Sequence, residues 1–100
     1  MTQHLYNSEG VWIAFRKDSM VFDRDGHWIG WLPWNDGEVV DTDGKYLATI
    51  VEENRLYRDE FRQPREFPPY PGRPKEPEFA WYPGFAGSAS LPVHMKDVNL

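Results

Sequence analysis

The chain contains no cysteine, and this absence removes three classes of structure and chemistry at once. Disulfide bonds, thiolate zinc sites and thiol nucleophiles are all excluded. No apolar run approaches the roughly 18 residues that a membrane span needs. Residues 1–4 have neither the basic patch nor the apolar segment of a secretory signal. We therefore expect a cytoplasmic protein that is stabilised by packing, with homo-oligomerisation as a further source of stability in so small a domain.

Positive charge is also scarce. The formal net charge is −5, and residues 1–57 hold five Lys and Arg against ten Asp and Glu. Nucleic-acid binding depends mainly on cationic contacts with phosphate, so this balance argues against a nucleic-acid partner. Five arginines nevertheless gather near the middle of the chain, with acidic residues between them. We interpret their stems as packing on aromatic rings, with an RNA site as the weaker alternative: Arg55, Arg58, Arg62, Arg65 and Arg73.

Patterns that carry catalysis or metal binding are missing as well. The histidines His4, His27 and His94 have no metal-ligand spacing. Residues 23–26 and 41–44 begin like calcium loops, but the later ligand positions fail, and we interpret both as turns. No serine lies in a nucleophile elbow, and no glycine-rich phosphate loop is present. The sequence predicts no enzyme, no cofactor and no metal site.

What the chain does contain is a repeat. Gly10, Gly26 and Gly44 lie 16 and 18 residues apart, and each is followed by an aromatic residue at +2, an aliphatic residue at +3 and Gly or Ala at +4. A fourth copy begins at Leu56, but Phe61 stands in place of its glycine. Self-similarity of this kind indicates a fold built from copies of one unit.

Each unit is typical of a β-hairpin. A loop of about three residues that ends in glycine predicts a type I turn closed by a residue with positive φ. A period of two then places Trp12, Trp28 and Tyr46 on the face of the small residues, and Ile13, Ile29 and Leu47 on the other face with Phe15, Trp31 and Thr49. We expect each small residue to receive the ring of a neighbouring unit, and a ligand groove is the alternative.

The composition changes after residue 62. Eight of the nine prolines lie between Pro64 and Pro92, which disfavours strands there. Yet this stretch carries more rings than a disordered segment would: Phe67, Tyr70, Phe79, Trp81, Tyr82 and Phe85. We therefore divide the chain into a hairpin repeat domain at residues 1–62 and an extended tail at residues 63–100. We expect this tail, the strap, to lie across the aromatic surface of the repeats.

Two patterns suggest binding. Aromatic hairpin repeats can hold sugars or quaternary amines, although the same rings are expected to form the core of a small β domain: Trp12, Trp28, Trp31, Trp34 and Tyr46. The second pattern, Pro71-Gly72-Arg73-Pro74, is a PxxP motif of the kind that SH3-like grooves bind, with Arg73 as a contact. Packing of this segment on its own domain is the simpler interpretation.

The repeated form of residues 22–32 and 41–46, followed by Gly72-Arg73-Pro74 in a proline-rich tail, resembles the small bacterial proteins of the 4-fold β-flower family. The resemblance covers roughly residues 5–75. It implies an all-β arrangement of about four hairpins around a pseudo-fourfold axis. It implies no established activity and no catalytic residue, and the incomplete fourth unit leaves closure of the ring open.

The sequence therefore predicts an all-β fold of three to four short hairpin repeats with a proline-rich irregular C-terminal strap. The predicted function is that of a non-enzymatic structural or protein-interaction module. Its partner is another protein or a second copy of the chain. Carbohydrate or cell-wall binding through the repeated rings is the alternative, and neither nucleic acid nor membrane is expected as a partner.

Overall fold

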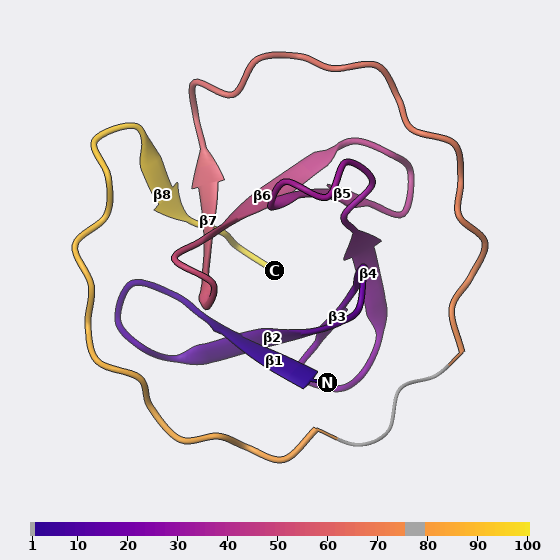
Figure 1. Ribbon diagram of the computed structural model, residues 1–100. Coiled ribbons are helices and arrows are strands. Elements are labelled where there is room, and N and C mark those ends of the chain that lie inside the picture. The colour runs from indigo at the N-terminus through magenta and orange to yellow at the C-terminus, as the bar shows by residue number, and fades with distance from the viewer. Residues whose placement is uncertain (1, 76–79) are drawn as a thin grey trace.

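The computed structural model describes residues 2–75 and 80–100, and every regular element in these residues is a β-strand (Figure 1). Three hairpins follow one another: β1 (Thr2–Tyr6) with β2 (Trp12–Lys17), β3 (Met20–Asp23) with β4 (Trp28–Trp31), and β5 (Glu38–Asp41) with β6 (Tyr46–Val51). β7 (Arg55–Asp59) continues the antiparallel order and ends next to β8 (Met95–Asp97). A parallel bridge between β1 and β7 closes the sheet into a barrel. The prediction of an all-β fold is confirmed.

The three hairpin turns share one hydrogen-bond pattern. In the second hairpin the side chain of Asp23 accepts the backbone N–H groups of Asp25 and His27, both at 2.9 Å. Gly26 closes the turn with a φ of 86° and donates its N–H to the carbonyl of Asp23 at 3.1 Å. Asp41 with Gly44 repeats these bonds in the third hairpin. The predicted turns are confirmed, because a side-chain acceptor and a glycine with positive φ recur where the sequence placed them.

A β-bulge follows each turn and changes the assignment of faces. Phe22 pairs with Trp28 and Val21 pairs with Gly30, so Ile29 is an extra residue without a partner. Ile13 and Leu47 are extra residues in the same place of their hairpins. One added residue breaks the period of two. The expectation that Ile13 shares a face with Phe15 was therefore wrong.

The two layers that result are an axial core and an outer ring cluster. The core takes one fully buried residue from the first strand of every unit, namely Leu5, Val21, Val39 and Leu56. The bulged aliphatic residues pack against this core. The outer cluster joins the rings of Trp12, Phe15 and Phe22 with Ala80 of the strap. The fourfold repetition thus lies in the core, with the aromatic layer outside it.

Gly30, the small residue after the second bulge, serves a close approach between strands. A methyl group on Gly30 would lie 2.1 Å from the carbonyl oxygen of Val40 in β5 and 3.2 Å from a methyl carbon of Val39. The neighbour of Gly30 is therefore strand backbone and an aliphatic side chain. The expectation that the ring of a neighbouring unit covers this position was wrong, because the bulge turns the rings to the outer layer.

The second strand of the fourth unit comes from the far end of the chain. Tyr57 pairs with Asp97 as Phe22 pairs with Trp28, and Val98 packs on the core beside the three bulged residues. Asp97 accepts the backbone N–H and the hydroxyl of Ser8 at 2.7 and 2.6 Å. We expected the whole of residues 63–100 to be an irregular tail; the last part instead completes the sheet, because β7 would otherwise keep an unpaired edge.

The described parts of the connection between β7 and β8, residues 60–75 and 80–94, run around the barrel as a belt (Figure 1). The whole connection is 35 residues long, numbers 60–94, and a proline-rich chain of this length could extend over about 108 Å at roughly 3.1 Å per residue. The molecule measures 35 × 34 × 19 Å, so a circle around it needs about the same length. This connection, called the strap from here on, is therefore just long enough to encircle the repeats once. Phe79 lies outside the described residues.

No helix in residues 2–75 or 80–100 has the length and hydropathy to cross a membrane.

Candidate functional site

The aromatic residue that recurs in each hairpin contacts the strap; these residues are Trp12, Trp28 and Tyr46. The centroid of Tyr82 lies 5.9 Å from that of Trp12, and the centroid of Tyr70 lies 5.8 Å from that of Trp28. In the third unit the guanidinium of Arg62 lies 4.7 Å from the ring centre of Tyr46. The strap meets these units in the reverse of their order along the chain. Three of the predicted site residues therefore hold the protein's own strap.

The indole N–H groups of two of these rings are also engaged. Trp12 donates to the carbonyl of Ala14 and Trp28 to the carbonyl of Gly30, both at 2.7 Å. Trp12 is buried, and Trp28 is half-buried. Arg73 is exposed and, with Pro74, lines a small cavity of about 120 Å³ beside Trp28. Two residues of the PxxP segment thus lie beside the repeat domain, and both interpretations of the motif stay predictions.

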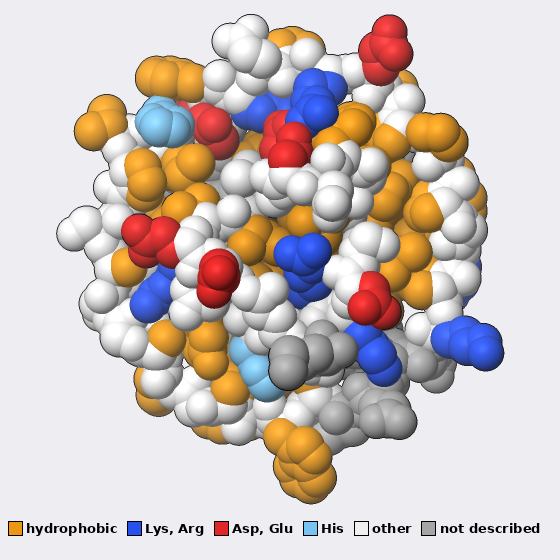
Figure 2. Space-filling view, viewed as in Figure 1, with side chains coloured by type: hydrophobic (Ala, Val, Ile, Leu, Met, Phe, Trp, Pro, Cys, Tyr) orange, Lys and Arg blue, Asp and Glu red, His pale blue; other side chains and the backbone are white. Residues whose placement is uncertain are grey.

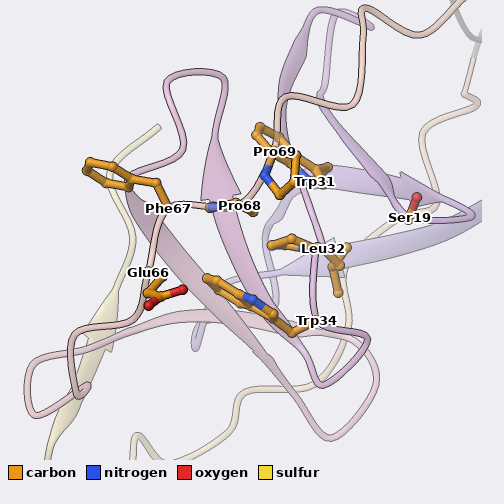
Figure 3. A pocket seen from close by; sticks show the side chains of 9 residues that line it. Ser19, Trp31, Leu32, Trp34, Glu66, Phe67, Pro68 and Pro69 are labelled. Carbon is orange, nitrogen blue, oxygen red and sulfur yellow. The ribbon is translucent and has the colours of Figure 1, made fainter.

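Trp31 and Trp34 border a larger cleft of about 460 Å³ between the barrel and the strap (Figure 3). Trp31 and Pro69 lie at one end in this view, Trp34 lies at the other, and Leu32 lies between them. The lining is mainly aromatic, aliphatic and proline, with one hydroxyl and one carboxylate: Ser19, Trp31, Leu32, Pro33, Trp34, Glu66, Phe67, Pro68 and Pro69. The cleft follows β4 because Pro33 ends the strand and a residue with positive φ, Asn35, turns the loop outward.

An ion-pair network fixes the indole of Trp34. The guanidinium of Arg65 stacks 3.8 Å from its ring centre and donates to Asp36 at 2.6 Å and to Glu38. Arg62 also donates to Glu38 at 2.6 Å. Burial alone would raise the pKa of Asp36, but the hydrogen bond and charge of Arg65 and a backbone N–H of Glu38 outweigh it and lower the pKa. The expected packing of arginines on rings is confirmed here, and it holds the cleft wall in place.

The strap leaves most of its rings facing outward. Phe67, Trp81 and Phe85 are 73%, 79% and 74% exposed. Apolar side chains project at several places around the rim of the molecule, where Figure 1 places the strap (Figure 2). The sequence predicted that these rings would be covered by the repeats. The strap instead contacts the barrel through Tyr70, Tyr82, Ala80 and its arginines, and through backbone hydrogen bonds such as that of Ala86 to the carbonyl of Gly10 at 2.9 Å.

The bulged residues line a second cavity, of about 440 Å³. Ile13, Ile29 and Leu47 contribute to its wall together with Leu100. The turn residues Asp23 and Asp25 border it, and with His27 they bring three possible metal ligands within 4.8 Å of one another. Because Asp23 already accepts the turn N–H groups and lies 3.2 Å from the His27 ring nitrogen, the turn itself explains this group.

Sequence reasoning found the aromatic wall of the 460 Å³ cleft and missed its opposite wall. Residues 66–69 of the strap were not proposed as binding residues, although Phe67 was noted among the rings of the tail. The Phe67-Pro68-Pro69 run was the available signal, since adjacent prolines disfavour a strand and an aromatic ring stands beside them. Glu66 carried no signal, because its position depends on the path of the strap.

Comparison with known proteins agrees with this architecture. No curated protein and no solved structure matches the chain. A family model described as "4-fold beta flower protein" matches residues 1–90, which is most of the chain and includes all three complete hairpins and much of the strap. With four core residues around one axis and a model match over this length, the chain belongs to the 4-fold β-flower family.

Proposed function

We propose that this β-flower protein is a non-enzymatic module that binds a protein partner in the cleft between residues 31–34 and residues 66–69. The observation that carries the proposal is the cleft itself, an open space of about 460 Å³ with two tryptophans on one wall. Ligand sites are usually concave and combine apolar side chains with a few polar groups, and tryptophan is enriched where proteins meet. The network around Trp34 keeps this wall ordered, so that less side-chain freedom is lost on binding.

The polar groups of the cleft support a role in binding over a role in catalysis. Ser19 and Glu66 come from a turn and from the strap, and among the described residues the lining contains no histidine, lysine or second carboxylate to act with them. A hydrolytic or transfer site needs a nucleophile and a base within hydrogen-bond reach of each other. The cytoplasmic location and self-association stay predictions from the sequence.

Carbohydrate binding is the second candidate, and the half-buried indole of Trp34 favours it. An aromatic face flanked by a hydroxyl and a carboxylate can stack on a sugar ring and hydrogen-bond its hydroxyls. The two candidates share the cleft and differ in the class of ligand.

A paired selection separates them. The wild-type chain, Trp34→Leu and Trp81→Leu are each presented to a displayed random peptide library and to a glycan array. Both variants lose one tryptophan, but only Trp34 lines the cleft. Peptides that bind the wild type and Trp81→Leu but do not bind Trp34→Leu support the proposal. Glycans with the same pattern support the second candidate. If neither a peptide nor a glycan loses its binding in Trp34→Leu, both candidates are contradicted.

A further inference from the structure

The strap shows what kind of chain the barrel surface accepts. Its described parts contain no strand between β7 and β8, and they are rich in proline. Tyr70, between two prolines, packs edge-on against both Trp28 and Trp31. Pro68 and Pro69 border the same cleft as Trp31 and Trp34. An extended proline-rich segment lying on aromatic rings is the arrangement by which SH3 and WW domains bind their ligands.

We propose that the partner segment bound in the 460 Å³ cleft is an extended proline-containing peptide with arginine or lysine beside the proline. This inference rests on the function proposed above and names the chemistry of its partner. A proline ring is flat enough to fit between an indole and another pyrrolidine. Its fixed φ means that little conformational entropy is lost on binding. The space left between the strap and the indoles would hold such a segment beside the strap.

The charge of the cleft supplies the second part of the proposal. Glu66 is the one ionisable group in the described lining, and it is exposed. Asp36 and Glu38 nearby are already paired with arginines of the strap, so they offer less to a ligand. Glu66 therefore selects a cation on the bound peptide. The chain's own Arg73 and Pro74 already line the cavity beside Trp28, so we place the peptide in a different molecule.

Fluorescence anisotropy with a labelled peptide of repeated Pro-Pro-Arg triplets tests the inference. Peptides of Gly-Ser-Arg triplets and of Pro-Pro-Glu triplets, equal in length, control for charge and for proline. We expect the Pro-Pro-Arg peptide to bind the wild type at least about tenfold more tightly than either control. Trp34→Leu should weaken this binding about tenfold, while Trp81→Leu leaves it unchanged. Glu66→Gln should weaken it about two- to fivefold, while Glu9→Gln, an equal charge change on a distant exposed turn, has no effect.

Two results would overturn the inference. Equal affinity for the Pro-Pro-Arg and Gly-Ser-Arg peptides means that charge alone binds them, and equal affinity of wild type and Trp34→Leu means that they bind elsewhere. Because Glu66 is exposed, its variant reports on binding even if the Trp34 variant unfolds. If library peptides without proline bind the wild type and lose this binding in Trp34→Leu, this inference is refuted and the proposed function stands. If no library peptide depends on Trp34, both fail.

Discussion

Replacing Gly30 by alanine tests the close approach of β4 and β5. The added methyl group would lie 2.1 Å from the Val40 carbonyl oxygen and 3.1 Å from its carbonyl carbon. The φ of Gly30 is not positive, so alanine can adopt its backbone conformation, and the cost comes from contact alone. Val40 cannot retreat freely, because β5 pairs with strands on both sides. Overpacking costs about 1–3 kcal/mol, and we expect the upper end because the contact is with backbone.

Thermal unfolding followed by circular dichroism measures this loss. For a domain of this size, about 3 kcal/mol corresponds to a fall of roughly 12–24 °C in Tm. Gly87→Ala is the matched control, because no atom lies within 4 Å of the added carbon and the φ of Gly87 is also not positive. That variant should be neutral or more stable by up to about 1 kcal/mol. If Gly30→Ala melts with the wild type, close approach does not explain the glycine.

Three further perturbations probe the hydrogen bonds between Asp97 and Ser8, the cleft wall and a buried hydroxyl. Asp97→Ala removes both acceptors of Ser8 and should lower the free energy of unfolding, measured in urea, by about 2 kcal/mol; an unchanged midpoint would show that these bonds add no stability. The folded-state pKa of Asp36 lies below its ordinary value of 3.8. The ionised carboxylate of Asp36 therefore stabilises the fold above that pH, and this stabilisation is lost as pH falls through the lowered pKa. Arg65→Gln should therefore flatten the acid side of the stability profile, and an unaltered acid slope would refute the pairing. The hydroxyl of Tyr57 is buried and has no hydrogen-bond partner in the described residues. Burial raises its pKa above 10.0. The free energy of unfolding should therefore fall as pH rises past that value. Tyr57→Phe should abolish this alkaline loss and be neutral or stabilising at neutral pH, whereas a destabilised variant would show that the hydroxyl is hydrogen-bonded in solution.

The local parts of the fold could be predicted from sequence because their causes are local. An acceptor side chain and a glycine define each turn within four residues, and aromatic and β-branched residues on either side favour strands. The bulge could not be found in the same way. Counting by two assumes that both strands advance together, and nothing in Trp28-Ile29-Gly30 shows that Ile29 has no partner.

The fourth unit and the outer wall of the cleft depend on distant contacts. Residues 95–98 have no glycine and no ring, so they carry no mark of the repeat, although Asp97 pairs where an aromatic residue stands in the other units. The position of Glu66 depends on where Arg65 stacks and Tyr70 packs. Trp31 and Trp34 were proposed as binding residues from their type alone, and only the path of the strap separates them from Trp12.

The placement of β8 has a consequence for synthesis on the ribosome. Strands β1 to β7 are complete once Asp59 has emerged, yet the edge from Tyr57 to Asp59 has no partner until Met95 to Asp97 follow it. At a usual rate of about 5–20 residues per second, that edge stays open for several seconds. An open strand edge is a template for pairing with another chain. Premature termination anywhere in the strap would leave it permanently open, so we expect shortened chains to be recovered as aggregates in place of smaller folded proteins.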